Sequence, residues 1–294
     1  MIINQATLAA VFQSFQTIYN QAFQGVPSEW NRIAMRVPSM TSEEIYAWLN
    51  AFAKMREWVG DRVLKDLSAS DFAIKNKDWE DTISVDRNQI EDDKIGLLTP
   101  ILQMMGQSAK EQPDEVVFGA LVAGFNSLCY DGQYFFDTDH PVGDGTVSNY
   151  AAGAGVAWYL MDTTRAIKPI VFQDRRALEF VSMTAPTDAN VFMQKKYIYG
   201  VDCRNNAGFG LWQLCYASKL ELTATNYATA RAAMMDFKND MGKPLGVRPN
   251  LLVTTSANEG KARSVVMMQK DAAGADNPWY NTAEVFIPRF LAAA

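Results

Sequence analysis

The longest helical pattern in the chain lies between residues 91 and 125, and a fold must be built around it. Apolar residues recur there at helical spacing, first from Leu97 to Met105 and again from Val117 to Phe125. Acidic residues at 91–93 suit a helix N-terminus, where the helix dipole is positive. Proline is tolerated in a first turn but kinks a helix interior, so Pro113 predicts the start of a fresh helix.

A second apolar helical stripe covers residues 6–24 and ends at Gly25 and Pro27. Its members are spaced by three or four positions: Leu8, Val11, Phe12, Phe15, Ile18, Tyr19 and Phe23. The opposite face carries Gln, Asn, Thr and Ser instead of charges, which suits contact with another protein surface. An ordinary terminal helix docked on its own domain is the alternative, and the pattern leaves both open.

A charged ribbon is predicted beyond segment 41–60, which is rich in tryptophan and helix formers. Apolar and polar residues alternate on both sides of residues 75–78, through Phe72 and Ile74 and then Trp79, Ile83 and Val85. Alternation of this kind predicts two strands with at least one solvent-facing side. Because an isolated two-stranded ribbon is marginally stable in water, it must lie on its own domain or on a neighbour.

The second half of the chain alternates strand-like and helical segments. A glycine-rich, loop-like stretch at 126–155 precedes four strand-like runs at 157–161, 167–173, 191–200 and 208–217. A helical period returns at 225–241, followed by a buried strand at 250–255, a helix that opens on an S-x-x-E capping box at 256–259, and a strand at 283–287. This order predicts an α+β or α/β fold.

Charge and cysteine content exclude several classes of protein. With 27 Lys and Arg against 33 Asp and Glu, the net charge of −6 lacks the cationic excess that DNA binding by the whole fold needs. The 3 cysteines cannot all pair and show no CxxC spacing, so neither a disulfide framework nor a zinc site is indicated.

Targeting and membrane signals are also missing. Residues 1–28 carry no charge, so the basic start of a signal peptide is absent, and the apolar stretch at 116–125 is about half the length of a membrane helix. We predict a soluble, intracellular chain without a cofactor.

One cluster could carry chemistry, because it holds the single histidine of the chain. Asp137, Asp139 and His140 stand together with Asp131 nearby, and such residues can ligate a metal. Pro141 stands where an EF-hand loop needs an oxygen ligand, and Asp, Gly and Pro are also usual in tight surface loops. A Cys129–His140 nucleophilic pair is conceivable, but the chain has no G-x-S-x-G elbow or other signature around it.

Phosphate and dinucleotide motifs are incomplete. The pairs Gly153/Gly155 and Gly208/Gly210 lack the third glycine, and Pro244 follows Gly242-Lys243 where a phosphate loop needs Ser or Thr. The sequence therefore predicts no catalytic, cofactor-binding or metal site.

Seven stretches, taken in order, resemble the family of the Mu-like prophage major head (capsid) subunit. They span essentially the whole chain: REWVGDRV (56–63), IEDDKIGLLTPILQMMG (90–106), PDEVVFGAL (113–121), CYDGQYFFDTDHPV (129–142), AWYLMDTTRAIKPIVFQDRR (157–176), YIYGVDCRNNAGFGLWQL (197–214) and GKPLGVRPNLLVTTSANEGKA (242–262). The resemblance implies an α+β, HK97-like phage capsid fold.

Four regions follow from that resemblance. Residues 1–40 would be an N-terminal arm, and 41–90 an extended loop (the E-loop hairpin) with its flanks. Residues 91–220 would form a peripheral domain, with a spine helix at 91–125, strands at 157–217 and a loop at 126–155 of uncertain membership. Residues 221–294 would form the axial domain around the hexamer and pentamer centres.

The function implied is that of a major capsid protein whose copies form hexamers and pentamers of an icosahedral shell around double-stranded DNA. The implied partners are further copies, a portal, a scaffold or protease, and a decoration protein, with DNA contacted weakly and no membrane. Assembly in the host bacterial cytoplasm is expected, as part of a virion. Candidate intersubunit contacts are Phe12, Phe15, Arg62, Lys65, Lys75, Lys77 and Asp78.

Three alternatives stay open at this point. A tail-tube subunit would form stacked rings, and a nanocompartment shell protein would enclose an enzyme cargo. A hydrolase or metal enzyme built on His140 would be a protein of a different class.

Overall fold

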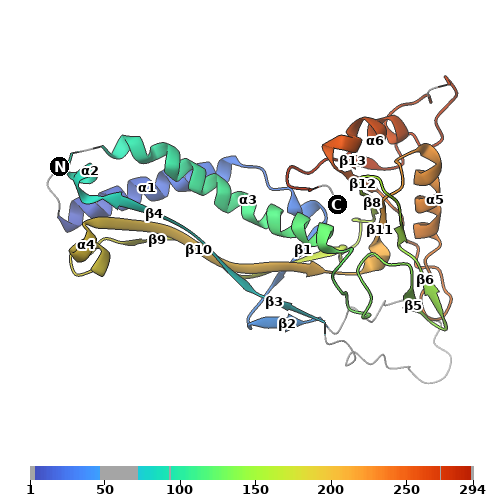
Figure 1. Cartoon of the computed structure of the whole chain (residues 1–294), viewed down its shortest axis with the longest axis horizontal. Helices are drawn as coiled ribbons and strands as arrows, with labels where there is room; N and C mark the ends of the chain where they lie inside the picture. Colours follow the sequence, from blue (N-terminus) through green and yellow to red (C-terminus); the bar gives the residue numbers. More distant parts are fainter. Residues whose placement is uncertain (1–3, 47–71, 93, 272, 293–294) are drawn as a thin grey trace.

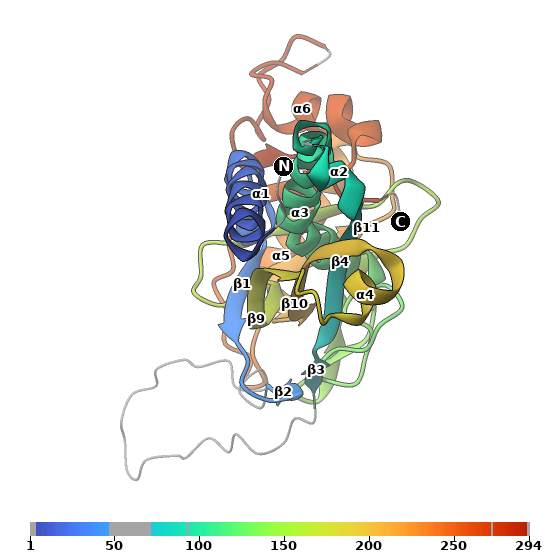
Figure 2. The same cartoon turned by 90° about the vertical axis from the view of Figure 1, so that its left-hand side faces the viewer.

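The chain folds into an elongated body joined to a compact body, as a computed structural model that describes residues 4–46, 72–92, 94–271 and 273–292 shows (Figure 1). Helices α1 (Gln5–Gly25) and α3 (Thr99–Ala123) lie side by side along the elongated body, on one face of a four-stranded sheet (Figure 2). The sheet order is β1 (Ala34–Pro38), β9 (Ile170–Met183), β10 (Lys196–Phe209) and β4 (Lys77–Asp86).

The core of the elongated body lies between these helices and the sheet. Phe15 of α1 meets the ring of Tyr199 of β10 edge-on at 4.9 Å, and both are fully buried. From α3, Leu102 and Met105 join the same cluster. The helical stripe predicted at 6–24 is therefore confirmed, and it faces the chain's own sheet.

The compact body is built on a five-stranded sheet in which the central strands are buried at every position. The order is β13 (Glu284–Phe286), β12 (Leu251–Thr254), β8 (Trp158–Met161), β11 (Cys215–Ser218) and β7 (Tyr150–Ala151). Helices α5 (Ala224–Met235) and α6 (Glu259–Val266) pack on this sheet through Tyr227, Met234 and Val266. Continuous apolar runs at 158–161 and 251–253 suit strands covered on both faces.

Short elements complete the described chain. They are η1 (Trp30–Arg32), β2 (Glu43–Ile45), β3 (Ala73–Lys75), α2 (Arg87–Glu91), η3 (Ile95–Leu98), β5 (His140–Val142), β6 (Gly145–Val147), α4 (Ala189–Gln194), η4 (Trp212–Leu214) and η5 (Ser256–Asn258). Three of the strands, β5 to β7, lie in the stretch that was expected to be loop.

The two bodies meet at a buried carboxylate. Asp114 of α3 accepts the backbone N–H groups of Glu29 at 2.9 Å and Trp30 at 2.6 Å, in the connection between α1 and β1. Burial raises the pKa of Asp114, against the effect of these two hydrogen bonds. The guanidinium of Arg289, near the end of the described chain, donates to the carbonyl of Pro27 at 2.7 Å. The C-terminal segment is thus tied to the same connection.

The prediction of a fresh helix at Pro113 is wrong. Pro113 lies inside the single helix α3, which begins at Thr99, and the short helices α2 and η3 precede it. Buried residues flank the proline on both sides, at Ala109 and at Asp114 and Val117. Packing along the whole length of α3 therefore outweighs the hydrogen bond that proline cannot donate.

The predicted ribbon is also wrong, because its two strands do not pair with each other. β3 pairs antiparallel with β2, whereas β4 pairs antiparallel with β10 from Asn205↔Lys77 to Lys196↔Asp86. Alternation shows that a strand exists but does not name its partner. The stretch 191–200 likewise divides into the end of α4 and the start of β10.

The strands predicted at 157–217 do not form one domain's sheet. β8 and β11 pair with each other and, through β8, with β12, while β9 and β10 belong to the elongated body. A boundary at residue 220 therefore passes through the five-stranded sheet.

The helix predicted at 225–241 ends at Met235, because Phe237 turns inward onto Trp212 with ring centroids 5.5 Å apart. Helix α6 begins at Glu259 after η5, with Asn258 rather than Ser256 at its N-cap and no side-chain cap bond. The amide of Asn258 instead donates to the carbonyl of Val156 at 3.1 Å. The helix is placed by this tertiary contact, so the predicted capping box does not form.

Helices α1 and α3 approach closely at Gly106, and this generates a testable prediction. A Cβ at residue 106 would lie 2.5 Å from the carbonyl oxygen of Tyr19 and 3.0 Å from the Cβ of Ala22. We expect Gly106→Ala to destabilise the unassembled subunit by about 1–3 kcal/mol in urea unfolding, because the helices must separate.

Gly119→Ala is the matched control on the same helix, since nothing lies within 4 Å of a Cβ there. It should stabilise the subunit by about 0.5–1 kcal/mol, because alanine favours the helix over glycine. Equal effects of the two substitutions would contradict a close helix contact at Gly106.

Candidate assembly surfaces and a buried Cys–Asp–His cluster

The two aromatic residues predicted as arm contacts occupy different positions. Phe15 has no exposed surface and belongs to the core of the elongated body, so in this structure it meets Tyr199 of its own chain instead of a surface partner. Phe12 is only partly buried, with its ring centroid 5.5 Å from that of Phe180. Of the pair, Phe12 is thus the one that remains accessible at the surface.

Three of the charged residues predicted on the ribbon, Lys75, Lys77 and Asp78, lie at the edge of the elongated body. Lys75 and Lys77 are exposed on β3 and β4. Asp78 is also exposed, and its Oδ1 lies 3.5 Å from the Nε of Arg204 on the neighbouring strand β10. Arg62 and Lys65 lie outside the described residues. The intersubunit role of all these charges stays a prediction.

A buried polar network fastens β2 and β3 to the main sheet. Gln173 of β9 accepts the Tyr46 hydroxyl at 2.8 Å, and its amide donates to the Ile74 carbonyl at 2.9 Å and to Asn76 at 2.8 Å. Glu44 closes the neighbouring turn by accepting the backbone N–H groups of Met40 and Thr41. These bonds lower the pKa of Glu44 to about 2, so the carboxylate stays ionised.

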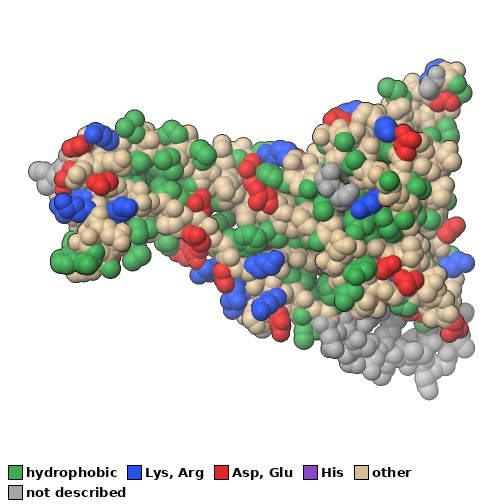
Figure 3. Space-filling view, in the orientation of Figure 1, with side chains coloured by type: hydrophobic (Ala, Val, Ile, Leu, Met, Phe, Trp, Pro, Cys, Tyr) green, Lys and Arg blue, Asp and Glu red, His purple; other side chains and the backbone are tan. Residues whose placement is uncertain are grey.

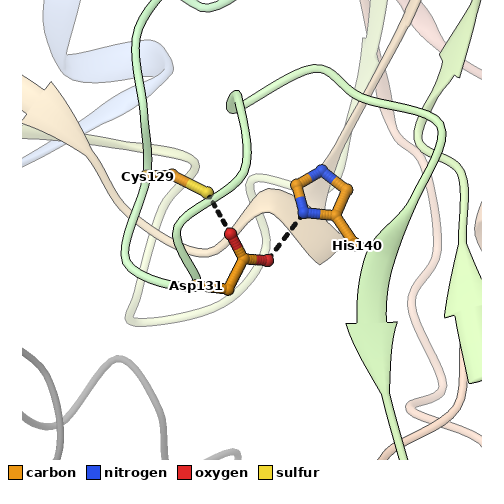
Figure 4. A group of neighbouring side chains, drawn as sticks. All are labelled: Cys129, Asp131 and His140. Atoms are coloured by element: carbon orange, nitrogen blue, oxygen red, sulfur yellow. Dashed lines mark hydrogen bonds and ion pairs between the residues drawn. The ribbon is translucent and has the colours of Figure 1, made fainter. Parts of the chain in front are cut away.

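His140 lies in the compact body as part of a buried cluster with Cys129 and Asp131 (Figure 4). The loop after α3 supplies Cys129 and Asp131, and β5 begins at His140. The Oδ2 of Asp131 lies 2.7 Å from Nδ1 of His140, and its Oδ1 accepts the Cys129 thiol at 2.9 Å. Burial raises the pKa of Asp131, but the bonds from His140 and Cys129 outweigh it and the net pKa is lowered.

The other ring nitrogen of His140 is fixed by Asn149. The amide of Asn149 donates to the carbonyls of Phe135 at 2.8 Å and Cys215 at 3.3 Å, so its Oδ1 is the acceptor that faces Nε2 at 3.2 Å. Asn149 therefore fixes the orientation of the imidazole ring from the side opposite Asp131. The imidazole also stacks on Trp212 with ring centroids 4.1 Å apart and an interplanar angle of 12°.

This geometry does not activate a nucleophile. The carboxylate of Asp131 receives both the thiol and the imidazole, so Cys129 donates to Asp131 instead of to His140. Burial, followed by the charge of Asp131, raises the pKa of the Cys129 thiol, whereas a reactive cysteine needs a lowered one. Cys129 is therefore held as a thiol in a hydrogen-bonded cluster.

The same three side chains are also of the kinds that could hold a metal ion. The ligand atoms of Cys129, Asp131 and His140 lie within 4.8 Å of one another. Each of these atoms already has a hydrogen-bond partner within the cluster. Asp137 caps its own loop by accepting the N–H groups of Tyr134 and Thr138, and Asp139 is exposed. Of the predicted acidic residues Asp131, Asp137 and Asp139, only Asp131 therefore contacts His140.

Asn149, Trp212 and Gln173 are the structurally important residues that the sequence did not point to. Each is isolated in its segment, without a helical or strand period of polar residues. A regular pattern could therefore not have identified them.

Among the described helices, none is both long and apolar enough to cross a membrane.

Comparison with known proteins gives matches over nearly the full length. The family model described as the Mu-like prophage major head subunit gpT matches residues 8–291. The Mu-like prophage FluMu major head subunit of Haemophilus influenzae is 40% identical over 283 residues, which cover 91% of this chain and 92% of that protein. The major capsid protein of Escherichia phage Mu is 38% identical over 285 residues, which cover 93% of each.

Solved structures agree with these relatives. A chain of the bacteriophage JBD30 procapsid matches with a TM-score of 0.85 and 45% identity over 97% of this chain and 99% of that one. A chain of the JBD30 capsid decorated with minor capsid protein trimers matches with a TM-score of 0.79 and 34% identity over 91% of this chain and 92% of that one. The predicted phage-capsid fold is confirmed, and the chain belongs to the family of the Mu-like prophage major head subunit.

Proposed function

We propose that the chain is the major capsid protein of a phage head, whose copies form hexamers and pentamers of an icosahedral shell around double-stranded DNA. The observation that carries this proposal is the family match over residues 8–291, which includes both bodies of the fold. A head that assembles in the host bacterial cytoplasm and becomes part of the virion follows from the same proposal.

The two bodies correspond to the two domains that such a subunit needs. We assign the elongated body, with α3 as its spine helix and β9 and β10 as its long strands, to the peripheral domain. The compact body, with the five-stranded sheet, becomes the axial domain around the ring centres. This assignment replaces the boundary at residue 220 with one that keeps each sheet whole.

Residues 41–90 retain their proposed role as the extended loop and its flanks. Strands β2 and β3 pair at Ile45↔Ala73, so the two chain ends that flank residues 47–71 lie side by side. The Gln173 network holds this base against the main sheet. The exposed charges Lys75, Lys77 and Asp78 next to the base are the proposed ion-pairing contacts with a neighbouring copy.

Weak contact with DNA follows from the charge. A net charge of −6 supplies no cationic excess for phosphate binding. The shell would therefore surround the packaged DNA and bind its phosphates only weakly. A portal and a scaffold or protease complete the proposed partners. A decoration protein is a further one, since the JBD30 capsid carries minor capsid protein trimers.

We further propose that the chain is no enzyme and that the Cys129–Asp131–His140 cluster is a structural clamp. It joins the loop after α3 to β5, and through Asn149 to the carbonyl of Cys215 at the start of β11. The loop after α3, the start of β5 and the more distant start of β11 are thereby held in one arrangement within the proposed axial domain.

Negative-stain microscopy of the purified chain, alone and with its neighbouring head gene products, tests the shell. We expect closed particles or free hexamer and pentamer rings. Stacked tubes would favour a tail-tube subunit, and shells that enclose an enzyme would favour a nanocompartment. A monodisperse monomer in both preparations would overturn self-assembly.

Replacing His140 by alanine tests the clamp. We expect a loss of about 3–5 kcal/mol in urea unfolding of the unassembled subunit, because the buried Asp131 carboxylate loses its partner and Trp212 its stacked ring. Asp139→Ala, one residue away but exposed, should change stability by less than about 0.5 kcal/mol.

Elemental analysis of the wild-type subunit accompanies this comparison. The structural role predicts no stoichiometric metal. A metal that co-purifies with the wild type and is lost in His140→Ala would instead favour the enzyme alternative.

A further inference from the structure

The C-terminal segment crosses the place where the two bodies meet. Strand β13 lies in the sheet of the compact body, and residues 287–292, called the C-terminal strap below, follow it directly. Figure 1 places this end of the chain between the two bodies. Figure 3 shows acidic and basic side chains gathered on the elongated body where it approaches the compact body.

One arginine of the strap reaches the elongated body. The guanidinium of Arg289 donates through Nη2 to the carbonyl of Pro27 at 2.7 Å, and its Nη1 lies 3.3 Å from Oε1 of Glu111 on α3. Oε2 of Glu29 accepts the backbone N–H of Arg289 at 3.1 Å and lies 3.8 Å from its Nε. The strap is therefore joined both to α3 and to the connection between α1 and β1.

A third carboxylate, that of Asp114, lies beside the same guanidinium with one oxygen unused. Its Oδ1 accepts the backbone N–H groups of Glu29 and Trp30, whereas its buried Oδ2 accepts no hydrogen bond from any residue that the structure describes. Nη2 of Arg289 lies 4.0 Å from this oxygen, about 1 Å beyond hydrogen-bond length. Because a buried carboxylate oxygen without a donor costs free energy, a hydrogen bond from Arg289 would stabilise it.

Arg289 thus has two alternative acceptors for Nη2. In the structure it bonds the carbonyl of Pro27, and a movement of about 1 Å would bring it to Oδ2 of Asp114. The strap continues from β13, so this movement would draw the compact body toward α3. Arg289 with its acceptors Pro27, Glu111 and Asp114 is called the latch below.

The sheet of the elongated body has an irregularity at the level of the latch. The pairing of β10 with β9 changes register between Asp202 and Asn205, and a strand bends at such a bulge. Asn205 exchanges two amide hydrogen bonds with Gln112 of α3, at 2.9 and 3.0 Å, and Gln112 follows Glu111 directly. The bulge therefore lies beside the turn of α3 that carries the latch.

We propose that the latch sets the angle between the two bodies, and that its two acceptor positions allow one chain to adopt both angles that hexamers and pentamers require. This inference rests on the proposed shell function and names the joint that such a shell uses. Packed interfaces switch between discrete arrangements instead of deforming continuously, so two positions of one guanidinium give two defined angles.

Distances between two spin labels test the latch in the unassembled subunit. The native cysteines are buried, so Gln13→Cys on α1 and Ser264→Cys on α6, both at exposed positions, provide the labelling sites. Arg289→Met keeps a long side chain but removes the guanidinium, and it should shift and broaden the distribution of label distances. Arg87→Met is the matched control, since Arg87 is similarly exposed but pairs within α2, and it should leave the distribution unchanged.

Asp114→Asn tests the second acceptor position. Its amide oxygen can still accept the two backbone N–H groups, but an N–H donor then stands where Oδ2 was, so Arg289 stays at the carbonyl of Pro27. The label distances should be distributed no more widely than in the wild type. Because one angle serves one kind of ring, the variant should form open sheets or tubes where the wild type forms closed particles.

The outcomes separate the latch from the shell function. Unchanged label distances in Arg289→Met would overturn the latch, as would equal broadening in Arg289→Met and Arg87→Met. Closed particles of Asp114→Asn in wild-type yield would show that the second position is not used, and the proposed role in the two kinds of ring would be wrong. Failure of the wild type to form any particle would instead overturn the shell function, while the label distances still decide whether the latch sets the angle.

Discussion

The antiparallel ladder between β9 and β10 is the element that both bodies depend on. It runs from Ile170↔Phe209, in the core shared with the compact body, to Met183↔Ile198 at the outer end. Each strand has 14 residues, so the ladder spans the elongated body without interruption by a loop. Helices α1 and α3 cover one face of this ladder, and α4 connects its strands at the far end. The position of the outer end relative to the compact body is therefore set by backbone hydrogen bonds.

An element of this fold could be predicted where the spacing of apolar residues along the sequence is enough to define it. The stripe at 6–24 was found because α1 buries one continuous face, including Val11, Phe15 and Tyr19. The ribbon was wrong because β4 pairs with β10, more than 100 residues further along the chain, and alternation says nothing about distant partners. The helix start predicted at Pro113 was wrong because buried residues on both sides of it, Ala109 and Val117, keep α3 continuous. The sequence does not show these contacts.

The candidate site shows the same limit. The closeness of Asp131 and His140 followed from their separation in one short loop, but their roles depend on Asn149 and Trp212, which approach from other segments. These two residues set the second hydrogen bond and the ring contact of His140, and no local pattern in the sequence indicates them. The function itself followed from the family resemblance, since a protein that acts through its surfaces carries no catalytic motif.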